Sequence, residues 1–470
     1  FENSSCSCCG GGSNSCGGGS SSSGGSGGGR NSSISSSGSC GGKSNSGGGA
    51  PFYPILAESK GATPTQYGFV FGIFELTVFI VSPIYGNYLN KIGPKFMFNA
   101  GIFTTATTCI MFGFLDRIND TNIFIGLSFA IRIVEAMGNS GFLTASFSII
   151  AKEFPDNVGA TFASLETCFG LGMIVGPTLG GALFELGGYT LPFVTLGCML
   201  LCAASLTYCI LPSYSSEFKG ESGSSGSMIS LIKVPAIALA AYAIIASSIS
   251  IGFLQATLEP HLRPLKLSPF QLGLMFVLNG ATYGFFAPLW GWLCDKRINP
   301  RIVVIFGSFM VMIAFIIIGP APFLPIPTTL PLCIFALVLH GTGFGAELVA
   351  TFTSAHRDAV ANGFPDDIET YGLVSGLWTS TFALGAFIGP SAAGALFDWI
   401  GFGWASVMLC VTYEMKLKFC KLFIIIPPHI LFGVYYTDND TSLSHTSFNI
   451  IFFIILSFKY IIGSLYLHKG

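Results

Sequence analysis

A small set of ionisable residues stands within or at the end of long apolar stretches of the 470-residue sequence. A charged side chain is costly in such surroundings, so each of these residues is a candidate site in its own right. A carboxylate placed there is suited to binding and releasing protons or to contacting an organic cation, and an arginine beside it neutralises its charge. The candidates are Glu75, Arg132, Glu135, Glu166, Glu259 and Glu347.

Arg132 and Glu135 are three positions apart, which places both side chains on one face of a helix. Two interpretations stay open: the residues form a static ion pair, or Glu135 faces a cavity while Arg132 relays its protonation. Glu75 has no cation within a helical turn, so we expect it to exchange protons or to meet a cation. For Glu166, which begins another apolar stretch, a functional and a structural role are equally open.

Glu347 follows the glycine-rich run 341–345 in its apolar stretch. His340 is near enough on the same stretch to join a proton relay, although a packed histidine is the simpler interpretation. Glu259 precedes Pro260 near the end of its stretch, where it either recruits cations or is a solvated residue at the membrane interface. No nucleophile with a neighbouring base and no dinucleotide-binding loop is found, so the sequence indicates neither an enzyme nor a cofactor.

The elements that carry these residues are predicted to be membrane-spanning helices. Charged residues make up 9% of the sequence, against about 25% in soluble domains. Apolar stretches of roughly 18–29 residues are long enough to cross about 30 Å of hydrocarbon. They lie near 66–89, 96–115, 122–150, 158–184, 190–211, 231–258, 270–293, 302–319, 331–351 and 371–397. The predicted fold class is therefore all-α, in an integral, polytopic membrane protein surrounded by lipid.

Basic residues in the connecting loops predict the orientation, because cytosolic loops carry an excess of lysine and arginine. The richer side is expected in the cytosol and carries Lys91, Lys95, Lys152, Lys219, Lys233, Lys296, Arg297, Arg301 and Arg357. The other side carries Lys60, Arg117, Arg263 and Lys266. The formal net charge of −2 does not distinguish between the two orientations. The sequence contains no patch for binding nucleic acid.

A cassette of the form Gly-Pro-x-x-(Gly/Ala)-Gly, followed by Ala-Leu-Phe and an acid, occurs at corresponding places in the two halves of the chain. Small residues let helices approach closely, and Gly-Pro introduces a kink where a bundle flexes. For each glycine taken singly, packing alone is the better interpretation. Duplicated bundles are typical of secondary transporters. The cassette residues are Gly176, Pro177, Gly180, Gly181, Gly389, Pro390 and Gly394.

The duplication divides the chain into two predicted helical bundles, at 51–211 and 231–407, joined by a Ser- and Gly-rich cytosolic linker at 212–230. Segment 1–49 is almost entirely Gly, Ser, Cys and Asn and is expected to be a disordered arm. Its cysteines lack a histidine and a second spaced pair, so no metal site is expected. Segment 408–470 is a divergent hydrophobic tail. Both end segments are open to interpretation as gene-model artefacts.

A second repeated element closes one span and opens a basic loop in each half. It resembles the Gly-x-x-x-Asp-(Arg/Lys)-x-Gly-(Arg/Lys) motif of major facilitator superfamily transporters. Asn90 replaces the first aspartate, whereas Asp295 keeps the second. The resemblance implies that these charges clasp helices across the cytosolic face; setting the topology alone is the alternative. The other motif residues are Gly86, Lys91, Gly93, Lys95, Gly291, Lys296 and Arg297.

Segments 113–117, 149–155, 164–167 and 372–377 resemble the vesicular amine transporter family, most closely its vesicular polyamine transporter branch. The resemblance covers about 51–407. It implies two six-helix-type bundles of which the first helix is missing, except for its exit at 51–54, and the twelfth is unrecognisable.

The same resemblance implies a monomer that exchanges protons for polyamines or related organic cations across a vesicle membrane by alternating access. Monoamine-type relatives have aspartates where this chain has Leu348 and Thr379, which disfavours a monoamine and favours a multiply charged cation. Two alternatives stay open. One is a proton-coupled exporter of drug-like organic cations at the plasma membrane, and the other is a non-transporting truncated product.

Overall fold

The computed structural model describes residues 52–210, 227–267, 269–296, 298–323 and 327–425, and every regular element in these ranges is helical. Two helices are short, α2 (Phe52–Ser59) and α8 (Met228–Ile232). The long helices are α3 (Pro64–Ile92), α4 (Pro94–Gly113), α5 (Thr121–Glu153), α6 (Val158–Gly187), α7 (Thr190–Ile210), α9 (Pro235–Leu262), α10 (Pro269–Lys296), α11 (Pro300–Ile318), α12 (Leu330–Ala361) and α13 (Ile368–Ile425).

The helix ends follow from local sequence. Thr63 and Gln66 form a capping box at the start of α3, with Pro64 in the first turn where its missing N–H is not needed. Gly93, at φ 91°, makes the sharp turn between α3 and α4, a conformation that a side chain would disfavour. Asp120 accepts the N–H groups of the first turn of α5.

Nine helices in the described ranges are long and apolar enough to cross a membrane, and each corresponds to one of the stretches predicted from the sequence. The remaining predicted stretch, 158–184, falls on α6, a 30-residue helix of which several side chains lie outside the described residues. The predicted fold class, an all-α polytopic membrane protein, is confirmed.

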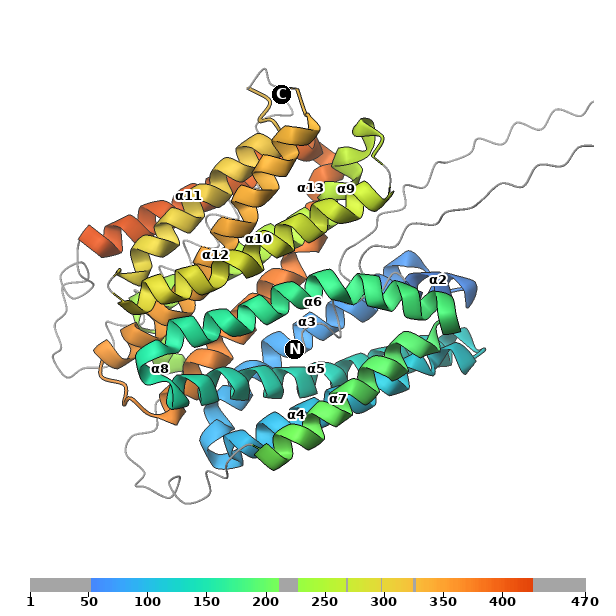
Figure 1. Cartoon of the computed structure of the whole chain (residues 1–470), viewed down its shortest axis with the longest axis horizontal. Coiled ribbons are helices and arrows are strands. Elements are labelled where there is room, and N and C mark those ends of the chain that lie inside the picture. The colour runs from blue at the N-terminus through green and yellow to red at the C-terminus, as the bar shows by residue number, and fades with distance from the viewer. Residues whose placement is uncertain (1–51, 211–226, 268, 297, 324–326, 426–470) are drawn as a thin grey trace, which may run out of the picture.

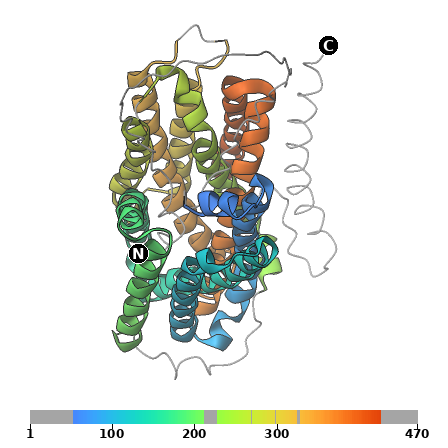
Figure 2. The same cartoon turned by 90° about the vertical axis from the view of Figure 1, so that its right-hand side faces the viewer.

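The helices form two groups that follow the halves of the sequence (Figures 1 and 2). In the first group α4 packs against α5 and α7, and α3 packs against α5. In the second, α12 packs against α10 and α11, and α9 packs against α13. The groups meet where α3 lies against α13 and where α6 lies against α10. Much of the linker predicted at 212–230 lies outside the described residues, and the predicted domain boundaries stay predictions.

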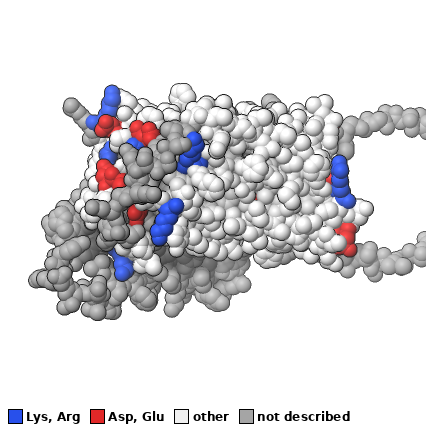
Figure 3. Space-filling model, turned by 90° about the horizontal axis from the view of Figure 1, so that it is seen from below, with Lys and Arg blue, Asp and Glu red and all other residues white. Residues whose placement is uncertain are grey.

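Charged side chains gather at the two ends of the molecule, and a broad uncharged band separates them on the face shown in Figure 3. One end, called the basic end below, carries the exposed residues Lys91, Lys233, Lys296 and Arg357. Arg117 and Arg263 are exposed at the opposite end. The basic end corresponds to the side that the sequence predicts to be cytosolic.

Helix α13 has two parts, separated by Gly401 at φ 75°. The second part extends beyond position 407, where the recognisable sequence ends, to Ile425. Its residues Ala405, Leu409 and Tyr413 are buried in a core that also holds residues of α9 and α11. This second part lies mostly in the segment 408–470, which the sequence led us to interpret as a divergent hydrophobic tail.

Glycines let helices of the two groups cross closely near the basic end. A Cβ atom on Gly376 of α13 would lie 3.0 Å from the Gly86 Cα of α3. A Cβ atom on Gly291 of α10 would lie 2.7 Å from the Ala163 Cβ of α6, and would also meet the carbonyl oxygen of Gly159. Gly86 and Gly291 are equivalent residues of the repeated loop element, so each half contributes one glycine to a crossing.

The close crossing of α6 and α10 predicts that one added methyl group at Gly291 lowers the stability of the protein. Gly291→Ala places a Cβ 2.7 Å from Ala163, so we expect the helices to be forced apart. The free energy of unfolding in detergent is expected to fall by about 1–3 kcal/mol, as in overpacked cores. Gly273→Ala is the matched control, because open space surrounds Gly273 on the same helix. Equal thermal stability of the two variants would contradict the close crossing.

Candidate functional site

Two acids predicted to be functional in the first half lie around one arginine. Arg132 and Glu135 of α5 form an ion pair, 3.1 Å from Nη1 to Oε2, and both are buried. The guanidinium lies over the ring of Phe112, 4.5 Å from its centroid, and also near the rings of Phe71 and Phe74. Such cation–π contacts stabilise a guanidinium away from water.

Glu75 of α3 completes this group, which is called the first acid cluster below. Glu75 is close enough to Arg132 for their charges to interact, and it forms no hydrogen bond or ion pair with another described residue. Two carboxylates, Glu75 and Glu135, therefore share one guanidinium. When both acids are ionised, these three residues carry one surplus negative charge. In apolar surroundings that charge favours the uptake of a proton or a cation.

Glu166 lies where the two halves meet. It is 5% exposed on α6, and its carboxylate accepts a hydrogen bond from the Tyr283 hydroxyl of α10. One residue further on, Thr167 donates to the carbonyl oxygen of Gly284 at 3.0 Å. Tyr283 could not be predicted as a partner from the sequence, because only the packing of α6 on α10 brings it to Glu166.

Glu347 is enclosed by α9, α12 and α13 and has no exposed surface. Its Oε1 lies 2.8 Å from Lys416 Nζ. Its Oε2 accepts hydrogen bonds from Ser247 at 2.5 Å and from Tyr413 at 3.2 Å. Lys416 also donates to Ser247 Oγ at 3.1 Å. These extra hydrogen bonds are what a fully buried ion pair needs to offset its desolvation.

Lys416 and Tyr413 are functional candidates that the sequence analysis misses, because they lie in the segment interpreted as a divergent tail. A signal was available. Lys416 sits in a chain region with many apolar residues and needs an acid to pair with, and Glu347 was the buried acid of the second half without an assigned partner.

The structure places Glu259 neither in the first acid cluster nor beside Glu347. Arg263 binds both oxygens of the Glu259 carboxylate at 2.8 Å, and both side chains are partly exposed, away from the basic end. His340 is buried, with Nδ1 3.0 Å from Asn279 Oδ1 and Nε2 3.4 Å from Ser250 Oγ. It has the contacts of a packed histidine, and no direct hydrogen bond joins it to Glu347.

Asp295 joins the two halves at the basic end. Its carboxylate accepts the backbone N–H groups of Gly159 at 3.0 Å and Ala160 at 2.7 Å, in the first turn of α6. The N-cap residue of α6, Asn157, makes no capping bond with its own side chain, so Asp295 caps this helix from the other half. Arg357 Nη2 lies 3.8 Å from the same carboxylate.

Asn90 makes the corresponding contact in the first half. Its Nδ2 donates to Glu369 Oε2 of α13 at 3.4 Å. The negative charge that the family motif places on α3 is therefore supplied here by the opposite helix. A polar contact between the halves is kept although the aspartate is absent.

The remaining motif residues lie at turns, crossings or the surface. Gly389 and Pro390 pack against Gly252 of α9, where a Cβ atom on Gly252 would lie 2.8 Å from Pro390 Cδ. Gly176 and Gly180 are buried, whereas added Cβ atoms on Gly181 and Gly394 would meet open space. Three lysines lie over aromatic rings, in the pairs Lys91–Tyr88, Lys95–Tyr208 and Lys296–Trp292. Arg297 and the side chain of Pro177 lie outside the described residues.

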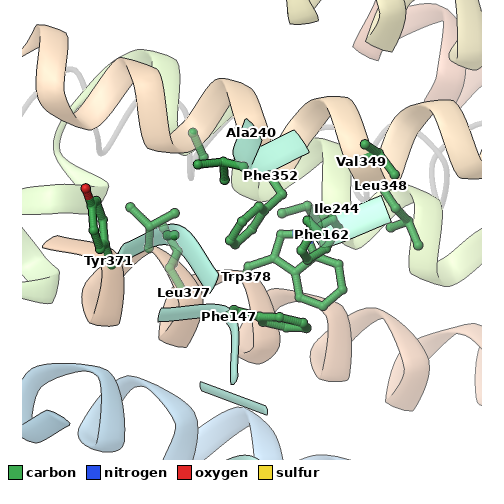
Figure 4. Close-up of a cluster of buried hydrophobic side chains, with 14 of the residues drawn as sticks. Phe147, Phe162, Ala240, Ile244, Leu348, Val349, Phe352, Tyr371, Leu377 and Trp378 are labelled. Carbon is green, nitrogen blue, oxygen red and sulfur yellow. The ribbon is translucent and has the colours of Figure 1, made fainter. Parts of the chain in front are cut away.

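Four aromatic side chains close the space between the halves toward the basic end (Figure 4). Phe147 of α5 and Phe162 of α6 come from the first half, and Phe352 of α12 and Trp378 of α13 from the second. Phe162 and Phe352 stack with ring centroids 4.2 Å apart, and Phe147 meets Trp378 edge-on at 5.2 Å. Because each half supplies two rings, the halves cannot separate at this end without breaking the cluster, which we call the aromatic plug.

The buried ion pair predicts a large cost for removing one partner. Lys416→Met leaves Glu347 without its counter-ion, and we expect the free energy of unfolding to fall by about 3–5 kcal/mol. Adding Glu347→Gln to this variant removes the stranded charge and is expected to restore part of the loss. Lys418→Met is the control, since Lys418 forms an exposed pair with Glu414. Equal stability of the two lysine variants in detergent would argue against a buried role for Lys416.

Comparison with known proteins agrees with this architecture. The family model of the Major Facilitator Superfamily matches residues 44–364 and 236–413. The rat MFS-type transporter SLC18B1 is 41% identical over 360 residues, which cover 76% of this chain and 78% of the relative. The human synaptic vesicular amine transporter is 25% identical over 375 residues, covering 77% of this chain and 67% of the relative.

A solved structure shows the same fold. The crystal structure of the human organic anion transporter MFSD10 (TETRAN) matches with a TM-score of 0.58 and 19% identity, covering 78% of this chain and 88% of that one. All of these relatives are transporters, in agreement with the expectation that this chain is not an enzyme. The chain belongs to the major facilitator superfamily; within it, it is similar to SLC18B1 and is more distantly related to the vesicular amine transporters.

Proposed function

We propose that this protein is a proton-coupled antiporter that moves polyamines or related organic cations across a vesicle membrane by alternating access. The names of its relatives, which include vesicular amine transporters, support an amine as substrate and a vesicle as location. Buried acids of this chain support the coupling to protons and the preference for a multiply charged amine.

The first acid cluster is the observation that carries the proposal. Glu75 and Glu135 face a single guanidinium, and Glu75 has no hydrogen-bonding partner among the described residues. One positive charge is needed to neutralise the cluster, and either a proton or an ammonium group supplies it. A site that holds one or the other, but not both, exchanges a proton for a cation.

The exchange runs in a fixed order. On the cytosolic side Glu75 loses its proton, and the carboxylate then attracts an ammonium group of the substrate. After the halves rock about the midplane, the acidic vesicle interior protonates Glu75 and the substrate is released. Glu135 stays paired with Arg132 in both states, so Glu75 is the carboxylate of the cluster that exchanges its proton.

Several separated carboxylates favour a substrate with several ammonium groups. Glu166 lies on the face of the first half that meets the second, and Glu75 lies on α3, which also crosses between the halves. The family resemblance implies aspartates in monoamine-type relatives at the positions of Leu348 and Thr379, so the second half is expected to offer fewer acids to a single amine. A polyamine bridges acids that a monoamine reaches one at a time.

Alternating access requires an end that opens and closes. The aromatic plug, the Asp295 cap and the glycine crossings all join the halves at the basic end. We assign this arrangement to the state that is closed toward the cytosol, because positive residues favour the cytosolic side.

Uptake into proteoliposomes tests the function. With an acidic interior, the purified protein is expected to accumulate spermidine and spermine, and accumulation should stop when a protonophore abolishes the gradient. Hydrophobic cations serve as the comparison. Accumulation of hydrophobic cations alone would favour the plasma-membrane exporter, and absence of any uptake would favour a non-transporting product.

Glu75→Gln removes the carboxylate that we assign to exchange. Coupling free energies of about 1–3 kcal/mol correspond to roughly 5- to 150-fold, so we expect gradient-driven accumulation to fall by a factor in that range. Glu185→Gln, at an exposed position of α6, is the matched control and should transport normally. Wild-type accumulation by Glu75→Gln would remove the first acid cluster from the mechanism.

Phe352→Ala removes one ring of the aromatic plug and should open the basic end more often. Aromatic pairs contribute about 0.5–1.5 kcal/mol beyond area burial, so the open population should rise at least about twofold. The readout is the labelling rate of a cysteine introduced as Leu348→Cys, in a protein without other cysteines, by a membrane-impermeant thiol reagent. Phe253→Ala, in the separate core of the second half, is the control and should leave this rate unchanged. A rate that does not respond to Phe352→Ala would rule out the plug as a barrier.

A further inference from the structure

A small cavity lies among helices of the second half, and three of its lining residues stand one helical turn from residues of the Glu347 site. Its volume is about 20 Å³, which is enough for one water molecule. Its lining comes from α9, α11, α12 and α13 and includes Ala243, Thr351 and Cys420. These helices belong to the second half alone, so the cavity is separate from the contact between the halves.

The helical register places this cavity next to the ion pair. Ala243 precedes Ser247 by four residues, Thr351 follows Glu347 by four, and Cys420 follows Lys416 by four. One helical turn is about 5.4 Å, so on three helices the cavity begins one turn from the residues that surround the Glu347 carboxylate. In each case the step leads toward the basic end.

The cavity has an unsatisfied polar group and a polar outer side. The Thr351 hydroxyl is buried, and it has no hydrogen-bond partner in the described part of the chain. At the outer side Arg301 and Asp358 form an ion pair of 2.6 Å, with 22% and 14% of their side chains exposed. Ser354 donates to the same Asp358 carboxylate at 3.1 Å. A water molecule in the cavity would therefore have polar partners on both sides.

We propose that this cavity is a water-filled entrance through which Glu347 exchanges protons with the cytosolic side. The proposal rests on the proposed proton coupling and adds a second proton site to it, inside the second half. The proton passes from the cavity water to Glu347 Oε1, the oxygen that faces Lys416 and accepts no bond from Ser247 or Tyr413. The donor is cavity water that has taken up a proton from the cytosolic side, as hydronium. It gives this proton to the carboxylate and is left as neutral water, and the carboxylate becomes a neutral carboxylic acid.

Protonation of Glu347 adds one positive charge to the buried pair and leaves Lys416 with its hydrogen bond to Ser247. The lysine then lacks its counter-ion, which favours a shift of the second part of α13 relative to α9 and α12. Proton binding is thereby linked to the packing of the helix that carries Lys416. The titratable and charged groups nearest to this site are Tyr242 of α9, Arg301 of α11, His340 and Asp358 of α12, and Tyr413, Lys416 and Cys420 of α13.

Infrared difference spectroscopy of proteoliposomes tests the proposal without any substrate. Acidification on the basic-end side is expected to produce the carbonyl band of a protonated carboxylic acid, and Glu347→Gln should remove that band. Thr351→Val keeps the shape of the side chain but lacks the hydroxyl. It should slow the appearance of the band by at least about tenfold, the factor that about 1.4 kcal/mol of barrier produces.

Two further threonine variants separate the loss of the cavity hydroxyl from other effects of the substitution. Thr353→Val also removes a buried hydroxyl from α12. The Thr353 hydroxyl donates to the Val349 carbonyl and does not line the cavity, so in this variant the band should appear at the wild-type rate. Thr351→Ser restores a hydroxyl and should restore the rate if Thr351→Val folds poorly. A band that survives Glu347→Gln, or an unchanged rate in Thr351→Val, overturns the proposal. Failure of spermidine uptake with the Glu347 band intact overturns only the transport proposal.

Discussion

The need to neutralise charge inside hydrocarbon organises the interior of this protein. Among the residues that the structure describes, each half contains a deeply buried ion pair, Arg132–Glu135 in the first and Glu347–Lys416 in the second. The pairs differ in what surrounds them. The first has a further carboxylate, Glu75, close to its arginine, whereas the second is balanced and closed by hydroxyl groups. The duplicated scaffold thus combines a first half that has one more acid than base at its buried site with a second half in which one acid faces one base.

The contact between the two halves at the basic end also uses few charged groups. Backbone amides, a carboxylate, stacked rings and glycine crossings hold the basic end together, and few of these contacts depend on a full ion pair. Asn90 and Glu369 even replace a charged clasp with an amide–carboxylate bond. Contacts of this kind are individually weak and short in range. They are suited to a surface that must separate and re-form many times, as alternating access demands.

The membrane spans could be predicted because length and depletion of charge are local properties of the sequence. The pairing of Arg132 with Glu135 was also accessible, since three residues along a helix fix a common face. The partners of Glu166 and Glu347 could not be predicted. Tyr283 is 117 positions from Glu166 and Lys416 is 69 positions from Glu347, and only tertiary packing brings each pair together. For Glu259 the sequence left cation recruitment and a solvated interfacial role open, and the structure pairs it with the partly exposed Arg263 four residues further on.

The cap that Asp295 places on α6 has one more consequence. A helix that borrows its N-cap from the opposite half is complete only while the two halves are together, so separation leaves the amides of Gly159 and Ala160 to water. A cap contributes about 1 kcal/mol, which is a roughly fivefold bias between two populations. The first turn of α6 is therefore expected to be less ordered when the halves are apart than when they are together. Hydrogen exchange of the Gly159 and Ala160 amides would then reflect the fraction of time that the halves are apart.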